Sequence, residues 1–593
     1  MRSRVFFVLF IISGVVGFSQ TIPSSRSTDW TLAGLRNTST DGFQTLYLDE
    51  HGLVGDGIES NDIAFSNVLA SLSGPGAYLI FPDGNFLFNQ TIHLPSNVIL
   101  RGQGATNTTL TLDLGGSGHG IQLEGTTNPT DTTYLIQSAF KESNLITVWN
   151  SAKLAVGDWV QIIMQDADLV TSEWAQQTVG QVVSIVSINQ NQIQLASPLR
   201  IDLDLSRTPY VQKIVPKSNV GIECLKMHRL DDTAPQQSAN IHFRYANNCW
   251  VRSIESENCT FSHIELRYCS NVHISKSYLH HAFDYGGGGR AYGVLLQFAT
   301  NECLVEDNIF EHLRHSMILQ AGANGNVFAY NYSIDPYWSD SGLFVPSDSS
   351  GDMVLHGNYP FLNLFEQNIC QNIVIDDSHG ANGAYNTFFR NRAESYGIYF
   401  SAGNSPDQNL VGNEIPNSSF PYSLVNYSIN GTGHLIHGNN NKGAIDLPGT
   451  QNLQDLSYAY SSRPAFVSLN QWAAIGTPNT MGTSTIPAYD RYHAGNIFGD
   501  GCDQLPTTLQ KIAEDAAGVK IFPLPVKDFL SVESQQVVKK LTVLNGLGQV
   551  VYTTSSPCKS CEIATSNWDR GIYLVSVLFE DNEVLVKKVI KIE

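Results

Sequence analysis

An arginine and a histidine stand side by side at Arg314 and His315, within the stretch "RHSMILQAGANGNVFAYN". Eliminative cleavage of an acidic sugar chain needs a base that removes the proton beside a carboxylate, and a positive charge that stabilises the resulting anion. His315 suits the base because a histidine titrates near about pH 6.5, and Arg314 suits the charge. The alternative interpretation of His315 alone is a buried turn histidine that the backbone satisfies.

Two long segments flank this pair, "HHAFDYGGGGRAYG" and "DPYWSDSGLFVPSDSSGD". Long loops on a rigid scaffold are the usual place for binding groups, and aromatic faces stack well on sugar rings. We therefore expect these segments, with two histidines farther along the chain, to bind the substrate. The expected binding residues are His280, His281, Asp284, Arg290, Tyr337, Trp338, His356 and His379.

Hydrolysis is the competing chemistry, and it requires two carboxyl groups that face each other across the scissile bond. Asp352 and Asp377 are the candidates, with Asp376 as a substitute for Asp377. Adjacent aspartates are equally common in solvated turns, so this pattern alone does not decide. Oxygen ligands for Ca²⁺ are plentiful, so Ca²⁺ is kept as a candidate cofactor, but no loop has a defined calcium-ligand spacing and no metal ligands are assigned.

An internal repeat predicts the scaffold for these residues. A motif of a few β-forming residues followed by asparagine recurs with that asparagine at positions 308, 331, 368, 391 and 413, in steps of 23, 37, 23 and 22 residues. A unit of this length suits three short strands joined by turns, and asparagines can hydrogen-bond their copies in adjacent turns. We predict an all-β, right-handed parallel β-helix, with the handedness taken from the preference of parallel crossovers.

The two long segments interrupt this repeat at the same point of the coil. They therefore rise from one edge, and the short connection from Glu311 to Ser316 lies between them. Because parallel strands stack about 4.8 Å apart, walls two coils apart would enclose a trench roughly 10 Å wide. We expect Arg314 and His315 on its floor.

Composition and charge limit the remaining classes. Residues 1–19 have the two arginines, apolar run and small-residue end of a signal peptide, and no later apolar run could span a membrane. The net charge of −20 disfavours nucleic acid and requires a local basic site for any polyanion. A secreted monomer is expected. Nine cysteines in so long a chain do not form a dense disulfide scaffold, and most, including Cys249 and Cys303, are expected to be free and buried.

The segment "GLVGDGIESNDIAFSNVLASL", followed by "YLIFPDGNFLFNQTIHLPSNVILRGQG", resembles the amino-terminal part of the pectate lyase superfamily. The resemblance implies a parallel β-helix at residues 20–515, with a helix near Asp62 to Leu72 that caps its open end, and a carbohydrate-facing groove. Hydrolases, lyases, epimerases and adhesins share this likeness, so it does not specify an activity. The full carboxylate motifs of pectin hydrolases and the arginine-rich signature of calcium-dependent pectate lyases are both absent from the sequence.

Two further units depart from the repeat. Residues of about 132–202 alternate like antiparallel strands and predict a small β insertion. Residues 521–593 resemble the C-terminal sorting domain of the type IX secretion system, through Pro525-Val526, Asn545-Gly-Leu-Gly548 and Gly571-Ile-Tyr573, although Leu524 departs from the family pattern. The resemblance implies a β-sandwich, the type IX machinery as a partner, and release or attachment at the outer surface. Cys558 and Cys561 predict a local disulfide there.

Taken together, these patterns favour a secreted, endo-acting enzyme that degrades a polysaccharide, with a lyase slightly ahead of a glycoside hydrolase. A noncatalytic glycan-binding or adhesive β-helix is the alternative from a different class.

Overall fold

The computed structural model describes residues 20–593 except positions 37, 232–236, 343–345, 425–426, 469–470, 499–501, 503–519, 523–528, 546–548, 556–557, 569, 580–583 and 592–593. The predicted signal peptide, and the Leu524 and Pro525-Val526 positions of the sorting motif, lie outside these residues. The chain divides into two compact units, Met1–Asp503 and Gln504–Glu593. Each unit is described separately below.

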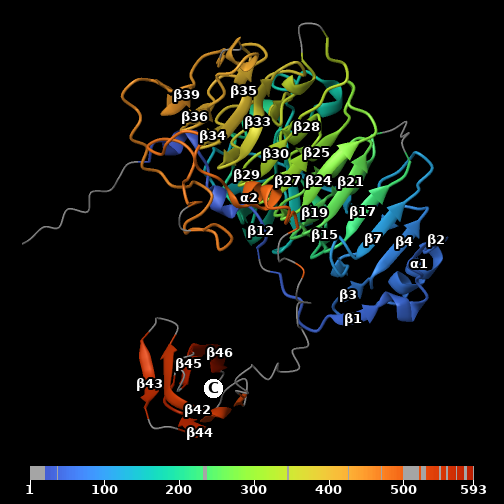
Figure 1. Cartoon of the computed structure of the whole chain (residues 1–593), viewed down its shortest axis with the longest axis vertical. Helices are drawn as coiled ribbons and strands as arrows, with labels where there is room; N and C mark the ends of the chain where they lie inside the picture. The colour runs from blue at the N-terminus through green and yellow to red at the C-terminus, as the bar shows by residue number, and fades with distance from the viewer. Residues whose placement is uncertain are drawn as a thin grey trace, which may run out of the picture. The chain divides into compact units, whose positions relative to one another are not determined.

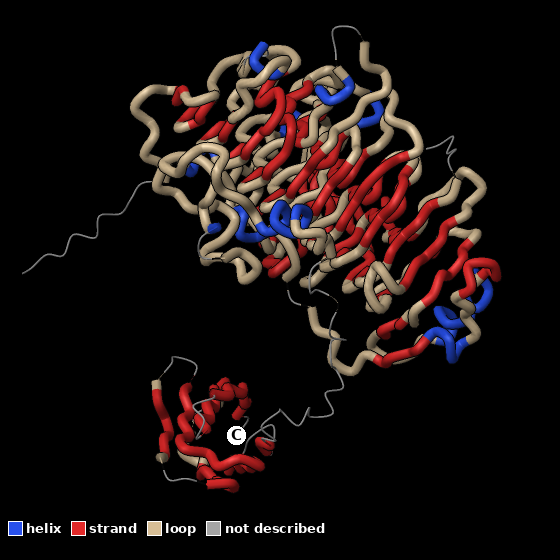
Figure 2. The backbone as a smooth tube through the Cα atoms, in the orientation of Figure 1, coloured by secondary structure: helices blue, strands red, loops and turns tan. Residues whose placement is uncertain are grey.

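The first unit is a parallel β-helix, which confirms the predicted fold (Figure 1, Figure 2). Its first face is a twelve-stranded parallel sheet, to which each coil contributes one short strand. The strands of this face, in spatial order, are β1 (Gln44–Tyr47), β3 (Ala77–Ile80), β6 (Val98–Arg101), β16 (Gly221–Glu223), β20 (Trp250–Arg252), β23 (His273–Ser275), β26 (Leu304–Glu306), β29 (Val327–Ala329), β32 (Leu364–Glu366), β34 (Thr387–Phe389), β36 (Asn409–Val411) and β38 (Leu435–His437).

The other two faces are joined into one sheet because β33 (Ile369–Asp376) and β35 (Arg392–Phe400) run around the corner between them. The second face contains β2 (Asp56–Ser60), β4 (Gly84–Phe88), β7 (Thr108–Leu112), β17 (Lys226–Arg229), β21 (Glu255–Cys259), β24 (Tyr278–Ala282), β27 (Ile309–Glu311), β30 (Tyr332–Ile334), β37 (Glu414–Ile415) and β39 (Asn439–Asn441), which forms a hairpin with β40 (Ala444–Asp446). The third face contains β5 (Ile92–His93), β8 (Ile121–Glu124), β18 (Ala239–Arg244), β22 (Ser262–Arg267), β25 (Tyr292–Gln297), β28 (His315–Leu319) and β31 (Met353–His356).

Alternation along these strands separates the core from the outer surface. On β25, Val294 and Leu296 point into the buried core of the coil, whereas Leu295 and Gln297 belong to the outer side. Register preserves this separation from coil to coil, since Leu295 pairs with Ile318 on β28, which pairs with Val354 on β31. Each outward position therefore forms a row along the helix axis.

The predicted asparagine ladder is confirmed. Asn308, Asn331, Asn368, Asn391 and Asn413 are fully buried, and each donates from its side-chain amide to the side-chain oxygen of the next, at 2.9 to 3.1 Å. The backbone turns therefore have their polar groups satisfied inside the coil. A second ladder of Asn326, Asn363 and Asn386 lies at the turn before the first face.

Removal of one rung should destabilise the β-helix strongly. In Asn368→Ala, the carbonyl of Phe328 and the side chains of Asn331 and Asn391 lose buried hydrogen bonds. We expect a loss of about 3 kcal/mol in the free energy of unfolding, because several buried polar groups are orphaned at once. Denaturant unfolding measures this loss. The exposed Asn128→Ala is the matched control and should change stability by less than about 0.5 kcal/mol.

The amino-terminal cap is also confirmed. Helix α1 (Asp62–Ser71) buries Phe65 and Val68 against the first coils, where the ring of Phe65 packs on Phe81 and Phe88 at 6.1 and 5.7 Å between centroids. The helix covers strand ends that would otherwise be open.

The predicted insertion is an antiparallel sheet, but it is longer than residues 132–202. It spans residues 126–215 because its outermost strand β9 pairs with β14, the last strand of the insertion. Its spatial order is β10 (Leu145–Thr147), β13 (Gln192–Leu195), β12 (Gln181–Asn189), β11 (Trp159–Ile163), β14 (Tyr210–Val215) and β9 (Thr126–Tyr134). Its apolar residues pack on Ala321, Phe361 and Leu362, in the turns between the third and first faces.

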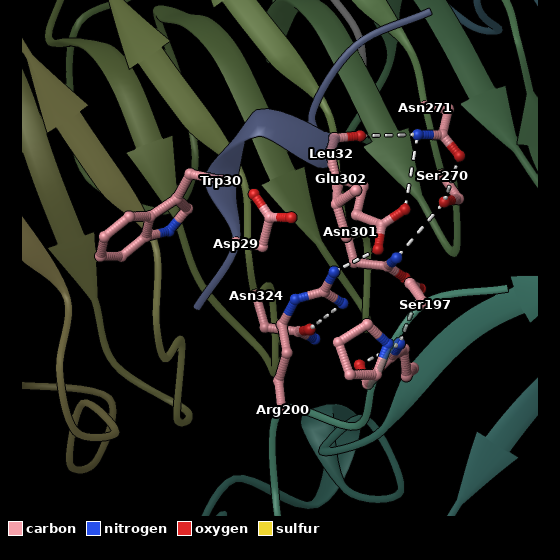
Figure 3. A network of polar contacts seen from close by, with 12 residues as sticks. Asp29, Trp30, Leu32, Ser197, Arg200, Ser270, Asn271, Asn301, Glu302 and Asn324 are labelled. Carbon is pink, nitrogen blue, oxygen red and sulfur yellow. Dashed lines mark hydrogen bonds and ion pairs between the residues drawn. The ribbon is translucent and has the colours of Figure 1, made fainter. Parts of the chain in front are cut away.

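A buried polar network attaches this insertion to the coil (Figure 3). The guanidinium of Arg200, on the insertion, forms an ion pair with Glu302 and donates to the side chain of Asn324 at 3.3 Å. The side chain of Asn301 donates to Val182 and accepts from it, at 3.0 and 2.8 Å. The amino-terminal segment joins the same network through the carbonyl of Leu32, which accepts from Asn271 at 3.1 Å. Three segments that are far apart in the sequence are therefore held together.

The cysteines follow the prediction in part. Cys249, Cys259, Cys269, Cys303 and Cys370 are free and buried. Cys224 and Cys502 instead form a disulfide across 278 residues, with their Cα atoms 5.6 Å apart. The sequence does not reveal this pair because only the fold brings the two residues together.

The second unit is an antiparallel sheet domain. The 17-residue strand β42 (Phe529–Asn545) pairs with β44 (Cys558–Ala564) over its first part and with β45 (Gly571–Phe579) over its second. The sheet also contains β41 (Lys520–Phe522), β43 (Val550–Thr554) and β46 (Val584–Lys591). Cys561 is disulfide-bonded. Within the described part of the chain, no helix is long and apolar enough to cross a membrane.

Candidate functional site

The two long segments rise from the same edge, between the second and third faces. Residues 283–291 join β24 to β25, and residues 335–352 join β30 to β31. They nevertheless do not enclose an open trench, because they contact each other: Gly287 N donates to Asp340 Oδ2 at 2.6 Å, and Ser339 N donates to the carbonyl of Tyr285 at 3.3 Å. The expected trench is therefore closed at this point.

The pocket opens instead on the outer side of the third face, with a volume of about 580 Å³. His315 is the first residue of β28 rather than part of a loop, and it pairs in register with Tyr292 on β25. The opposite wall comes from the insertion through Trp174. The lining residues are Trp174, Gln237, Phe261, Arg267, Gly288, Gly289, Tyr292, Gln297, Phe298, Arg314, Gln320, His356 and His379.

A histidine that lines this pocket pairs with an aspartate outside its lining. His356 ends β31 and lies in register with Asp376 at the end of β33, and His356 Nδ1 is 2.7 Å from Asp376 Oδ2. Burial alone would raise the pKa of Asp376, but the contact with His356 and its charge outweigh burial and hold this pKa below its ordinary value. Asp376 is thus an anion in ion-pair contact with Nδ1 of His356, without a hydrogen bond to that atom among the described residues, and Nε2 of the ring is left for the pocket.

Two neutral histidines flank this pair. The ring centroid of His379 lies 4.8 Å from that of His356, and burial together with the charge of His356 lowers the pKa of His379. The ring of His315 lies 5.4 Å from His356 on another side. Burial, followed by the charges of Arg314 and His356, lowers the pKa of His315 well below its ordinary value. Both flanking rings are therefore neutral at neutral pH.

The hydrogen bond of His315 fixes its tautomer. Its Nδ1 lies 2.9 Å from the carbonyl oxygen of Gly351, and since a carbonyl only accepts, Nδ1 carries the proton. Nε2 therefore has a free lone pair, and among the described residues this buried atom has no hydrogen-bond partner, in a residue that is 8% exposed. The hydrogen bond to Gly351 agrees with the interpretation of His315 as a buried histidine that the backbone satisfies. That interpretation does not explain the free Nε2 beside His356.

Arg314 and Tyr292 complete the centre. The Nη1 atom of Arg314 donates to the carbonyl of Gly286 at 3.0 Å, and its Cζ lies 6.0 Å from the ring centroid of Trp338. Burial raises the pKa of Tyr292, so its phenol keeps its proton. The pocket thus combines a fixed cation, a neutral proton donor and an oriented histidine.

Other predicted binding residues lie outside this pocket. His280 and His281 are on β24 in the second face, where their Nδ1 atoms are 2.9 Å apart and His280 Nε2 contacts Glu255 at 3.1 Å. The ring of Tyr337 stacks on His312 of the same face at 4.9 Å. Asp284 and Arg290 pair with each other at 3.0 Å within their own loop, and both are partly exposed.

The two predicted hydrolytic carboxylates have structural partners. Asp352 is 1% exposed and accepts from the Ser333 hydroxyl at 2.6 Å and from the backbone of Gln371 and Asn372 at 2.9 and 2.8 Å. Asp377 accepts from the Ser401 hydroxyl at 2.7 Å and the backbone of Asn404 at 2.9 Å. Neither residue lines the pocket. Asp376, the substitute candidate, does not line the pocket either, but it contacts the lining residue His356.

Sequence reasoning missed the other wall and floor of the pocket. Trp174 comes from an insertion whose docking is not encoded in the repeat. One row of lining residues consists of the residue that follows the last inward position on successive third-face strands: Arg267, Gln297 and Gln320. An alignment of those strand sequences would have shown this row.

Only one group of three residues in the described part of the chain has a spacing that could suit a metal: His119, His242 and Glu265, with ligand atoms within 4.8 Å. Two observations disfavour this use. His119 Nδ1 accepts from the backbone N–H of Ala239 at 3.1 Å, so the proton lies on Nε2, the atom that would bind the metal. Glu265 already accepts from His242, Arg267 and Gln297. As it stands, this donor set does not fit a metal.

Residues 520–593 match the secretion system C-terminal sorting domain. This match confirms the predicted tail, and no curated protein matches the chain. Solved structures resemble it at low identity. An exopolygalacturonase from Thermotoga maritima is 11% identical, covering 70% of this chain and 95% of its own, with a TM-score of 0.39. The tailspike gp61 of Pseudomonas phage phi297 is 11% identical, covering 88% and 96%, with a TM-score of 0.38.

The tailspike gp54 of Acinetobacter baumannii bacteriophage AP22, solved with a capsular saccharide, is 12% identical, covering 92% of this chain and 94% of its own, with a TM-score of 0.35. These likenesses are confined to the fold and carry no inference about activity. Fold and tail together define a parallel β-helix protein. It carries a type IX sorting domain and is therefore secreted or attached to the cell surface.

Proposed function

We propose that this protein cleaves an acidic polysaccharide by β-elimination in the pocket on the third face. The observation that carries the proposal is charge: Arg267 and Arg314 are the charged lining residues other than histidines, in a chain of net charge −20. A positively charged pocket in an acidic protein attracts a polyanion. Among the described lining residues there is no carboxylate, so hydrolysis between two opposed carboxyl groups has no support.

The pocket residues divide the reaction between them. Nε2 of His356 removes the proton from the carbon next to the sugar carboxylate, and Asp376 stabilises the imidazolium that forms. Arg314 neutralises the negative charge that develops on the carboxylate oxygens. The bond to the neighbouring sugar oxygen breaks as the carbon–carbon double bond forms, and the Tyr292 phenol protonates the leaving oxygen. The proton on His356 then restores the phenol, so no net proton is consumed.

A substrate panel tests this proposal. The mature protein is incubated with polygalacturonate, alginate, chondroitin and a neutral glucan, and absorbance near 235 nm and reducing ends are recorded together. We expect both signals to rise on an acidic polymer, because elimination creates an unsaturated chain end. Reducing ends without absorbance would identify a hydrolase instead. Binding without either signal would identify a noncatalytic glycan-binding protein.

A further inference from the structure

Arg267 presents a free guanidinium fork to the pocket. Its Nε donates to Glu265 at 2.5 Å, and the structure gives no partner within the described residues to its two terminal nitrogens. The side chain is 29% exposed and lines the pocket. Because Nε is occupied, the two terminal N–H groups remain in the planar arrangement that binds a carboxylate or sulfate ester through two hydrogen bonds.

A buried carboxylate holds this fork in place. Glu265 is fully buried, and besides Arg267 it accepts from His242 at 2.8 Å and Gln297 at 2.5 Å. Gln297 in turn accepts from Gln320 at 2.6 Å. Burial alone would raise the pKa of Glu265, but the hydrogen bond from His242 and the charge of Arg267 lower it to about 2, so Glu265 remains an anion. The row runs from Arg267 to Gln320, on the coil next to that of His356.

An aromatic row runs beside this polar row. The ring of Tyr268 stacks between Tyr245 and Phe298, with centroids 4.9 and 5.6 Å away, and Trp174 meets Phe298 at 5.8 Å. The Cζ atom of Arg267 lies 5.2 Å from the centroid of Phe298, so the guanidinium rests on an aromatic face. Stacking of this kind restricts the arginine without using its terminal N–H groups.

We propose that Arg267 is a second anion-binding subsite, which receives an acidic group of the same polysaccharide at a distance from the cleaved unit. This inference rests on the proposed function for the position of the reaction centre. Three strand spacings, about 14 Å, separate β22 from β31, so the chain lies along the helix axis with several sugar units over the third face. The enzyme therefore selects a linear polymer with regularly repeated anionic groups.

Binding measurements with the inactive His356→Ala protein test the subsite apart from catalysis. The probes are polygalacturonate and alginate fragments, which carry carboxylates, and carrageenan fragments, which carry sulfate esters. We expect Arg267→Gln, combined with His356→Ala, to weaken binding of the preferred polymer by roughly 10- to 100-fold. Arg267→Lys should recover only part of the affinity, because a point charge replaces the fork.

The matched control is Arg207→Gln, which removes a partly exposed arginine that pairs with Asp168 in the insertion. It should leave the affinity within about twofold. Unchanged affinity in Arg267→Gln, or no binding of any anionic probe, would overturn the subsite. If affinity depends on Arg267 but the protein with His356 intact turns over none of the polymers, the subsite is supported and the lyase proposal is contradicted. Turnover with a KM that does not change in Arg267→Gln would support the lyase proposal and contradict the subsite.

Discussion

Replacement of His356 by alanine should reduce turnover of the acidic substrate by roughly 10²- to 10⁴-fold, the contribution typical of a positioned general base. The physical reason is that His356 is the pocket histidine held by a carboxylate, with Asp376 Oδ2 2.7 Å from its Nδ1. Initial rates at 235 nm under saturating substrate measure the loss. Substrate affinity should change much less, because the two pocket arginines remain.

Two further variants test whether the loss of turnover comes from removal of the base or from misfolding. Asp376→Asn keeps the size of the side chain but removes the charge that orients the ring, so we expect a smaller decrease of roughly 10- to 100-fold. His437→Gln, on β38 of the first face, is the matched control and should keep full activity. Comparable thermal unfolding of all three proteins would exclude misfolding. A His356→Ala protein with normal turnover would exclude this histidine as the base and leave His315 as the next candidate.

The repeat explains why the scaffold could be predicted. Each buried asparagine must hydrogen-bond to its copy one coil away, and this physical need imposes a spacing that is visible in the sequence. The same spacing located the two interrupting loops and placed Arg314 and His315 at the edge from which they rise. These features depend on local turn chemistry repeated along the chain, and local chemistry is what a sequence displays most directly.

The pocket itself depends on contacts that no repeat encodes. Residues 283–291 and 335–352 meet through Gly287 and Asp340, which closes the expected trench. The facing wall comes from Trp174, on an insertion that precedes all the lining strands in the sequence and packs against the coil turns. His356 was expected only to bind substrate, because its pairing with Asp376 requires the register of β31 with β33. Tertiary register, and not residue type, thus decides which polar residue is oriented.

The largest effect on stability is expected at the junction that carries this wall. Arg200 and Glu302 are 1% and 4% exposed, so Glu302→Gln leaves a buried guanidinium without its counterion (Figure 3). Loss of one partner from a buried ion pair costs about 3–5 kcal/mol, and denaturant unfolding of the full chain measures it. Asp168→Asn breaks the exposed pair with Arg207 and should cost no more than about 1 kcal/mol.

A second measurement connects this junction to the pocket. Because Trp174 belongs to the insertion that Arg200 anchors, Glu302→Gln should also weaken polysaccharide binding under conditions where the coil remains folded. The double variant Arg200→Met/Glu302→Leu removes both charges and should recover part of the stability, since no buried charge is left unpaired. If Glu302→Gln unfolds at the same denaturant concentration as the parent protein, the ion pair does not hold the insertion, and the pocket wall must be supported by the Asn301–Val182 hydrogen bonds and by apolar packing on Phe361 and Leu362.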